Sequence, residues 1–282
     1  MQLHVESEHT PLRAVVMATP RHFRVVDPIN VAQERFFATA PPLVDALVAE
    51  QQGFVELLER HGARVLWATP PPECPLQLNT RDIGVVVGDR YVEGRMRRPV
   101  RAREPEAVRE LLESFTGRRA GITRGYLEGG DVLVDGRDVF VGVGERTDTD
   151  GAAELQAILG DGYTVHVLRL SPRILHLDVV LNLLPGNLAL IYPPGLIEIP
   201  DRVRRAYDLI VVTDEEQDRL ATNVLSLDER TVVADERNER VASILTNRGL
   251  DVRALPFAET TKIGGSFRCS TLPLVRGATA TT

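Results

Sequence analysis

Four segments of this chain repeat one pattern, in which an apolar run meets a short polar turn and is followed by a second apolar run. Such a pattern is typical of a β-hairpin. The turns recur at intervals of roughly 45 to 50 residues, which is a spacing that indicates an internal repeat. The four segments are residues 83–92 around Gly88-Asp89-Arg90, 132–143 around Asp135-Gly136-Arg137, 181–191 around Pro185-Gly186-Asn187, and 224–233 around Asp228-Glu229-Arg230.

Helical and extended patterns follow several of these hairpins. Residues 236–248 place apolar side chains at helical spacing, Gly249 is suited to cap that helix, and residues 250–256 resume as a strand. In the same way, residues 147–159 predict a helix and residues 163–170 a strand. A first unit fits less regularly, with residues 13–17 and 64–67 as strands and residues 42–61 as a long helix.

Five ββαβ-like units would form one closed, propeller-like α/β domain over residues 1–282. The alternative is an irregular α/β domain whose hairpins recur by chance. The proline-rich stretch at residues 70–75 is interpreted as a loop between repeats, because no low-complexity linker divides the chain.

Composition narrows the class of partner. The net charge is −7 and the isoelectric point is near 5.5, which argues against a nucleic-acid surface, because phosphate binding needs an excess of Lys and Arg. A cationic small molecule is the better electrostatic match. The N-terminus has no secretory signal, and no apolar stretch approaches the roughly 20 residues that span a bilayer. A cytoplasmic protein without membrane contact is therefore expected.

Cysteine is rare, with only Cys74 and Cys269, so a disulfide framework is not predicted. Cys269 follows the glycine pair Gly264-Gly265 and is either a buried filler or a nucleophile. No zinc spacing, Walker A or G-x-G-x-x-G sequence occurs, so neither a metal nor a cofactor is expected. Cofactor-free covalent catalysis remains as the class of enzyme.

Acidic residues near the ends of the predicted hairpin units suit a guanidinium ligand, whose planar N–H donors match carboxylates in charge and geometry. They are Asp82, Glu128 and Asp178. If His176 and Asp178 lie on a strand, they project from the same face, because side chains at i and i+2 do so.

Each candidate also has a simpler explanation. Asp82 fits a strand-capping acid paired with an arginine, Glu128-Gly129-Gly130 fits a turn, and His176 fits a hydrogen-bonded core histidine. Cys269 fits a buried filler. These explanations lose force only if the residues converge in space.

Taken together, the motifs resemble those of the amidinotransferase, arginine deiminase and dimethylarginine dimethylaminohydrolase superfamily, closest to its compact dimethylarginine dimethylaminohydrolase-like members. The stretches that carry this resemblance are Thr80-Arg81-Asp82, Leu127-Glu128-Gly129-Gly130-Asp131, His176-Leu177-Asp178 and the glycine pair before Cys269, with residues 24–30 and 222–227 in support. The resemblance implies the pentein fold, a five-bladed ββαβ propeller, for the whole chain.

By resemblance, Cys269 is the nucleophile on the guanidinium carbon and forms a covalent amidino-thioether. His176 protonates the leaving amine and then activates water. Glu128, Asp82 and Asp178 hold the guanidinium, with Glu128 also orienting His176. Arg146 resembles an arginine that binds the substrate carboxylate in dimethylarginine hydrolases.

Arg101 lies in the basic run of residues 95–103 and is a second candidate for the substrate carboxylate, although a solvated basic loop explains that run equally well. The resemblance implies a hydrolase that converts arginine or N-methylated arginine to citrulline. An amidinotransferase is the alternative, and a non-catalytic binding protein of the same fold is a more distant one. In having an acid at position 178, the chain resembles the deiminases and transferases, whereas dimethylarginine hydrolases often lack an acid there. The oligomeric state stays open, a homodimer included.

Overall fold

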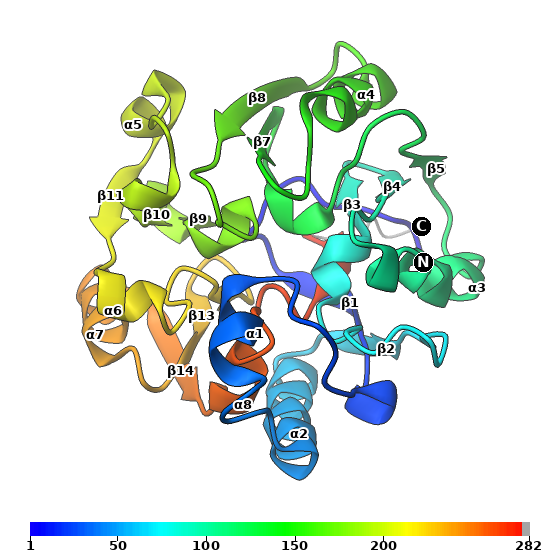
Figure 1. Cartoon of the computed structure of the whole chain (residues 1–282). Helices are drawn as coiled ribbons and strands as arrows, with labels where there is room; N and C mark the ends of the chain where they lie inside the picture. Colours follow the sequence, from blue (N-terminus) through cyan, green and yellow to red (C-terminus); the bar gives the residue numbers. More distant parts are fainter. Residues whose placement is uncertain (278–282) are drawn as a thin grey trace.

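Among residues 1–277, which the computed structural model describes, the strands form five separate three-stranded sheets. Figure 1 shows these sheets arranged around a common centre. The strand orders are β15-β1-β2, β3-β4-β5, β6-β7-β8, β9-β10-β11 and β12-β13-β14. The strands are β1 (Leu12–Met17), β2 (Arg64–Trp67), β3 (Gly84–Val87), β4 (Arg90–Glu93), β5 (Arg118–Gly121), β6 (Val132–Asp135), β7 (Asp138–Val143), β8 (Thr164–Arg169), β9 (Leu181–Leu184), β10 (Leu188–Ile191), β11 (Asp208–Val211), β12 (Leu225–Ser226), β13 (Thr231–Asp235), β14 (Asp251–Leu255) and β15 (Leu272–Arg276).

Each sheet has the same internal arrangement. Its middle strand pairs antiparallel with one neighbour and parallel with the other, as β7 does with β6 and with β8. An antiparallel pair closes through a short turn, whereas a parallel pair needs a longer crossover. The four predicted hairpins are confirmed as the pairs β3–β4, β6–β7, β9–β10 and β12–β13. The fold is therefore mixed α/β and built on a repeated unit.

Helices supply most of the crossovers. The three helices expected from apolar spacing are confirmed as α2, α4 and α7, and each lies within two or three residues of its predicted ends. The α-helices are α1 (Val31–Phe36), α2 (Val44–Arg60), α3 (Arg109–Leu112), α4 (Thr149–Leu159), α5 (Asp201–Ala206), α6 (Asp214–Gln217), α7 (Glu239–Asn247) and α8 (Ala258–Thr261). The 3₁₀ helices are η1 (Pro20–His22), η2 (Thr80–Ile83), η3 (Pro99–Arg101), η4 (Glu104–Val108), η5 (Gly129–Asp131), η6 (Leu177–Val179), η7 (Pro185–Asn187) and η8 (Pro193–Gly195).

The first sheet joins the two ends of the chain. β15 pairs antiparallel with β1, and β1 pairs parallel with β2. All five residues of β15 are buried. This pairing explains why the first unit looked irregular in the sequence, since its hairpin partner comes from the C-terminal segment. It also carries Cys269, three residues before β15, to the centre of the fold.

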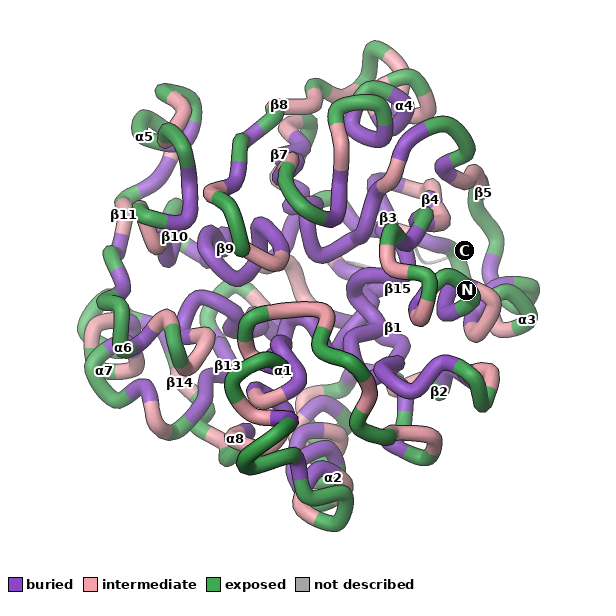
Figure 2. The backbone as a smooth tube through the Cα atoms, in the orientation of Figure 1, coloured by how far each residue is buried: buried purple, intermediate pink, exposed green. Residues whose placement is uncertain are grey.

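Burial falls from the centre to the rim (Figure 2). Every residue of β3, β9, β13 and β15 is buried, whereas the outer strands β2, β5, β8, β11 and β14 all contain exposed residues. The short helices η2, η5 and η6 lead into the inner strands β3, β6 and β9, and η5 contacts both η2 and η6. The inner strands thus deliver their preceding loops to one central point.

The expectation that His176 and Asp178 share the face of a strand is wrong. His176 has an extended backbone and serves as the N-cap of η6, and Asp178 lies inside that 3₁₀ helix. Both residues are nevertheless fully buried at the centre. None of the described helices has the length and apolar character required to cross a membrane.

Candidate active site

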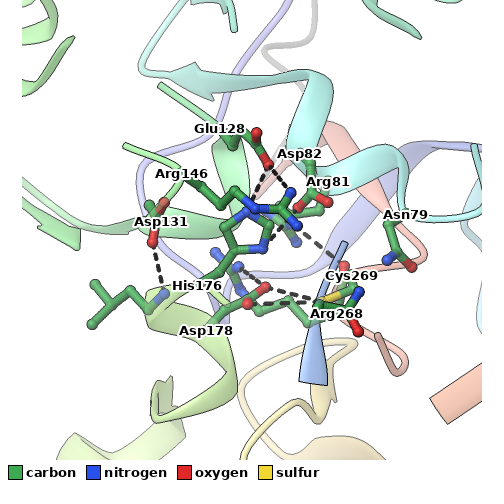
Figure 3. A network of polar contacts seen from close by, with 12 residues as sticks. Asn79, Arg81, Asp82, Glu128, Asp131, Arg146, His176, Asp178, Arg268 and Cys269 are labelled. Carbon is green, nitrogen blue, oxygen red and sulfur yellow. Dashed lines mark hydrogen bonds and ion pairs between the residues drawn. The ribbon is translucent and has the colours of Figure 1, made fainter. Parts of the chain in front are cut away.

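Four segments far apart in the chain bring their polar side chains together at the centre of the fold, as Figure 3 shows. Each of these side chains has a relative exposure of 0%. They come from η2, η5, the start of η6 and the loop before β15, and they are Asp82, Glu128, Asp131, His176, Asp178 and Cys269. The convergence that the sequence left open is therefore present, which removes most of the force of the simpler explanations.

His176 lies between two carboxylates. Its Nε2 is 2.8 Å from Glu128 Oε2, and its Nδ1 is 3.5 Å from Asp82 Oδ1. Burial alone would lower the pKa of His176, but the carboxylates of Asp82, Asp131 and Glu128 outweigh burial and raise it to about 9. The ring is therefore an imidazolium at neutral pH and carries a proton to donate.

Glu128 is fixed on three sides. Its Oε2 accepts from His176 and, at 3.2 Å, from Arg146 Nη1, while Oε1 accepts from the backbone N–H of Arg97 at 3.1 Å. Burial alone would raise the pKa of Glu128, yet its hydrogen bond to His176 and the charges of His176, Arg146 and Arg101 hold it well below its usual range. Glu128 therefore remains a carboxylate that orients the imidazolium.

The loop carrying Cys269 is shaped by glycines and by one asparagine. Gly264 has a φ of +102°, which favours glycine, and a Cβ on Gly265 would lie 2.8 Å from Cys269 Cβ. Asn223 Oδ1 accepts from the backbone N–H groups of both Ser266 and Cys269 at 3.1 Å. The glycine pair noted in the sequence thus has a packing reason beside the cysteine.

The thiol of Cys269 faces Asp178. Sγ is 3.5 Å from Asp178 Oδ2 and 3.7 Å from Oδ1. Burial raises the pKa of the thiol well above its usual range, and the carboxylates of Asp178 and Asp82 raise it further. Cys269 is therefore a neutral thiol at rest, in a position where a bound cation would favour the thiolate.

Asp178 is also held by an arginine of the protein. Arg268 Nη1 donates to Asp178 Oδ2 at 2.7 Å, and the same guanidinium donates to Glu8 through Nε and Nη2 at 3.3 and 3.0 Å. Arg268 is 1% exposed, and Glu8 is 5% exposed. The second acid of the site thus has only part of its hydrogen-bonding capacity left for a ligand.

Arg101 is buried and already engaged, unlike a solvated basic loop. Its Nη1 donates to Asp82 Oδ2 at 2.7 Å, while Nε and Nη2 both donate to Glu104 and Nη2 also donates to the carbonyl of Asn79. An arginine has five N–H donors. In this arrangement Arg101 ties the acids of the site together and has little capacity left for a substrate carboxylate.

Arg146 has more free donors. Its Nη1 donates to Glu128 and its Nη2 donates to the carbonyl of Ile29 at 2.7 Å, whereas the buried Nε has no hydrogen-bond partner. The side chain is 1% exposed. Of the two predicted arginines, Arg146 has the geometry better suited to an anionic group.

Among the described residues, two buried carboxylate oxygens lack a hydrogen-bond partner, and these are Asp82 Oδ1 and Asp131 Oδ2. A Cβ added to Gly130 would lie 2.6 Å from Asp82 Oδ1 and 2.8 Å from His176 Nδ1, so only glycine leaves this corner open. Buried polar atoms are normally paired. The unpaired oxygen of Asp82 is therefore suited to accept a hydrogen bond from a ligand.

A model of the family described as N,N-dimethylarginine dimethylhydrolase, eukaryotic, matches residues 20–276. This match spans most of the chain, including every residue of the central cluster. The chain belongs to this family. The predicted membership of the amidinotransferase, arginine deiminase and dimethylarginine dimethylaminohydrolase superfamily is confirmed.

Individual members of the superfamily show the same likeness. The N(G),N(G)-dimethylarginine dimethylaminohydrolase of Mycobacterium tuberculosis is 31% identical over 93% of this chain and 86% of that protein. The N-terminal domain of ArgZ, a cyanobacterial arginine dihydrolase solved with bound product, superposes with a TM-score of 0.84 and 25% identity over 94% of this chain and 98% of that chain. The amidinotransferase SxtG of Microseira wollei has a TM-score of 0.84 and 21% identity over 99% of both chains, which shows the fold alone.

In this dimethylarginine dimethylhydrolase family member, three residues of the site are of types that can bind a metal ion. Ligand atoms of Asp82, Glu128 and His176 lie within 4.8 Å of one another. However, Arg101 and Arg146 donate to these carboxylates, and His176 carries a proton at neutral pH. A metal ion would have to displace those charges, so the set is better suited to a cation that donates hydrogen bonds.

Four supporting residues of this family member had no role assigned from the sequence. Asn223 shapes the cysteine loop, Arg268 and Glu8 hold Asp178, and Asp131 accepts from the backbone N–H of Leu177 at 2.9 Å. Burial raises the pKa of Asp131 to about 7, despite the charge of His176. A signal existed for Arg268, because it immediately precedes the cysteine, but nothing local pointed to Glu8, 260 residues away.

A cavity of about 290 Å³ lies beside the central cluster. It is lined on one side by α1 and on the other by Leu175, Val179 and Gly264, which neighbour His176, Asp178 and the cysteine loop. Asn30 Nδ2 and Gln33 Nε2 both donate to the carbonyl of Ile263, so the start of α1 is tied to that loop. The cavity therefore adjoins segments that carry the buried cluster.

Proposed function

We propose that this protein is a cofactor-free hydrolase that attacks the guanidinium carbon of arginine or an N-methylated arginine through Cys269. The observation that carries the proposal is the fully buried convergence of a thiol, an imidazolium and an unpaired carboxylate oxygen. The chemistry of that set fits a cationic substrate with several N–H donors.

Binding of the guanidinium uses the acids beside the thiol. Asp82 Oδ1 has no hydrogen-bond partner, and Asp178 Oδ1 faces the thiol. Two N–H groups of the substrate would donate to these oxygens, and the substrate would reach them from the cavity under α1. The arriving positive charge offsets the carboxylates that raise the pKa of Cys269, so the thiol releases its proton to solvent when substrate is bound.

The first half of the reaction forms a bond between Sγ and the guanidinium carbon. His176, held as an imidazolium by Glu128, gives its proton to the departing nitrogen. The carbon–nitrogen bond then breaks and ammonia or a methylamine leaves. The products of this half are a covalent amidino-thioether on Cys269 and a neutral imidazole.

In the second half, water replaces the departed amine. The neutral imidazole of His176 takes a proton from water as its oxygen bonds to the same carbon. The bond from carbon to Sγ breaks and the thiolate leaves, so that a ureido product such as citrulline is released. Protons return to the imidazole and the thiol, and no redox or metal partner takes part in these steps.

Arg146 is the proposed partner of the substrate carboxylate, because its Nε is buried and unpaired. Arg101 is proposed to act on Asp82 and Glu128 instead, since its donors are engaged there. The five sheets and their order support a five-bladed pentein propeller forming one catalytic domain over residues 1–282. The last five residues of that domain lie outside the described part of the chain.

The same acids bear on the degree of methylation. Asp82 and Asp178 are both fully buried, and each would take one substrate nitrogen. Methyl groups on those nitrogens would remove donors and leave buried oxygens unpaired, which is costly. We therefore propose a preference for unmethylated or singly methylated arginine.

The proposal is tested by mass spectrometry of the purified protein with arginine, monomethylarginine, dimethylarginine and agmatine, with and without glycine as an acceptor amine. A ureido product in the absence of acceptor is the expected result, with arginine turned over faster than dimethylarginine. An amidino product formed only when glycine is present would instead establish an amidinotransferase, a class in which an acid at the position of Asp178 is also found. Absence of turnover on every guanidine would support the non-catalytic binding protein.

A further inference from the structure

The proposed function does not explain why Asp178, the acid that faces the thiol, already binds a guanidinium of the protein, that of Arg268. Arg268 Nη1 donates to Asp178 Oδ2 at 2.7 Å, and Cys269 Sγ lies 3.5 Å from the same oxygen. Arg268 is therefore adjacent to the nucleophile in sequence and joined to it in space through one carboxylate.

We propose that Arg268 is a positioning residue that holds Asp178 in the orientation required beside Cys269 and is itself held by Glu8 from the N-terminal segment. This inference rests on the proposed function, because it assigns the support of the same nucleophile and acid. It adds a requirement for which the sequence offered one signal, the position of Arg268 immediately before Cys269.

The contacts of Arg268 exploit the fixed fork of a guanidinium. Nε and Nη2 donate to the two oxygens of Glu8, Nη2 also donates to the carbonyl of Val132 at 2.8 Å, and Nη1 donates to Asp178. A lysine ammonium is a single point charge and cannot span these three acceptors at once. The geometry therefore requires arginine and not merely a positive charge.

Glu8 is in turn fixed by further contacts. Its Oε1 accepts from the backbone N–H of Val134 at 3.2 Å, and its Oε2 is 3.8 Å from Arg81 Nη1. Burial alone would raise the pKa of Glu8, but the charges of Arg268 and Arg81 lower it to about 2. Glu8 is therefore ionised throughout the neutral range and gives Arg268 a permanent partner.

The arrangement controls which oxygen of Asp178 is free. Oδ2 is taken by Arg268, and within residues 1–277 the thiol is the one hydrogen-bond partner of Oδ1. A substrate guanidinium would thus meet a single available oxygen on Asp178, at a fixed angle to Sγ. If Arg268 were absent, the carboxylate of Asp178 could rotate, and either of its oxygens could accept from the substrate in more than one orientation.

The charges around the thiol also support a role for Arg268. Asp178 from η6 and Asp82 from η2 face Cys269, and Arg268 from its own loop is the cation among its closest charged neighbours. Removing Arg268 would leave Asp178 as a buried acid without a cation beside the thiol. Such an acid disfavours the thiolate and therefore the nucleophile.

The experiment uses the full chain in a Cys74→Ser background, so that Cys269 is the only thiol. The rate of alkylation by iodoacetamide is measured from pH 6 to 11 without substrate, and kcat and KM are measured with arginine. The variants are Arg268→Met, Arg268→Lys and Glu8→Gln. The matched control is Arg276→Met, because Arg276 is equally buried at 1% but its side chain, within the described part of the chain, donates to the carbonyls of Thr10 and Ser226 and to no carboxylate.

For Arg268→Met we expect the alkylation rate at pH 8 to fall at least tenfold and its profile to move to higher pH. Arg268→Lys should keep most of the profile but lower kcat by at least tenfold, since charge is retained and orientation is lost. Glu8→Gln should shift both readouts in the same direction as Arg268→Met but less, and it serves if the Arg268→Met protein does not fold. Arg276→Met should leave the profile in place.

An Arg268→Met protein with the wild-type alkylation profile and unchanged kcat and KM would overturn the inference, as would an equal shift in Arg276→Met. If Arg268→Met does not fold, an unshifted profile in Glu8→Gln would overturn it. The alkylation readout needs no turnover, so it stands apart from the proposed function. Failure of Cys269→Ser to abolish turnover would defeat the function alone, while an unshifted profile in an otherwise active Cys269 enzyme would defeat only the role of Arg268.

Discussion

Two buried charge clusters meet at the centre of this protein, and they differ in what they leave unpaired. The first, here called the site cluster, consists of Asp82, Glu104, Glu128, Asp131, Arg101, Arg146 and His176. The second, here called the support cluster, consists of Glu8, Asp178, Arg81, Arg268 and Arg276. The site cluster has more acids than cations, and besides two nitrogens, Arg146 Nε and His176 Nδ1, it leaves carboxylate oxygens of Asp82 and Asp131 without a hydrogen-bond partner. The support cluster has more cations than acids and leaves donors of Arg81 and Arg276 unpaired.

The difference indicates a division of labour. Unpaired buried acceptors suit a cationic ligand that arrives later, whereas the support cluster already carries a guanidinium of the protein, that of Arg268, on Asp178 Oδ2. The two clusters touch where Arg268 meets Asp178, beside the thiol. Substitutions in the site cluster should therefore damage turnover more than stability, whereas substitutions of Glu8 and Arg268 in the support cluster should damage both.

The largest effect is expected from the thiol that lies between the clusters. Cys269→Ser should lower kcat by about 10⁴-fold or more, because serine is a far poorer nucleophile without a dedicated base. Its free energy of unfolding in urea should stay close to the wild-type value, since the side chains are similar in size. Steady-state turnover of arginine measures the first effect. Activity retained in Cys269→Ser would assign the nucleophile elsewhere.

The next effect tests the acid and base of the site cluster. His176→Ala should lower kcat by about 10² to 10⁴-fold, because both leaving-group protonation and water activation are lost. If the attack on the substrate remains faster than hydrolysis of the adduct, the covalent adduct on Cys269 should be detectable by intact-protein mass spectrometry. Normal turnover in this variant would remove His176 from the reaction, and Glu128→Gln should give a smaller loss in the same direction.

Stability separates the clusters most directly. Glu8→Gln should lower the free energy of unfolding by about 3 kcal/mol, because a buried carboxylate that pairs with Arg268 is lost and the guanidinium stays behind. Asp82→Asn should cost less stability, since Arg101 keeps its contacts with Glu104. Urea unfolding at pH 7 measures both. Equal losses would contradict the division between the clusters.

The clusters should also respond to pH with opposite signs. The pKa of Glu8 is lowered from 4.5 to about 2, so its stabilising effect is present above pH 4.5 and is lost as pH falls toward 2. The pKa of His176 is raised from 6.5 to about 9, so its effect is present below pH 6.5 and is lost as pH rises through 9.

Urea unfolding across pH should therefore show an acid-side loss that is reduced in Glu8→Gln and an alkaline-side loss that is reduced in His176→Ala. The value of kcat/KM should also fall above about pH 9, as the imidazolium loses its proton. An alkaline loss of stability that is unchanged in His176→Ala would separate the titration from this residue.

The sequence predicted the repeated sheets well because hairpin turns and helix spacing are local signals. It failed at the first sheet, where β15 reaches β1 from the other end of the chain, since no local pattern reports so distant a pairing. It also treated His176 and Asp178 as strand neighbours, although both reach the centre from a 3₁₀ helix and its cap.

The site shows the same limit. The residues of the site cluster with a named role lie in short motifs and were found from them. In the support cluster Asp178 was found from its motif, but Glu8 and Arg268 were given no role, because their contact joins residues 260 positions apart. Burial likewise separated Arg101 from the exposed arginines of its basic run, which composition alone could not do.

The smallest effect concerns the two arginines of the site cluster. Arg146→Lys should raise the KM for arginine by about tenfold and leave agmatine, which lacks the carboxylate, nearly unchanged, because the free Nε of Arg146 is the donor suited to that group. Arg101→Lys should instead affect both substrates equally, since Arg101 holds Asp82 and Glu104. A comparison of KM for the two substrates in each variant measures this. A larger arginine-specific effect in Arg101→Lys would exchange the two assignments and show that the site cluster rearranges when substrate binds.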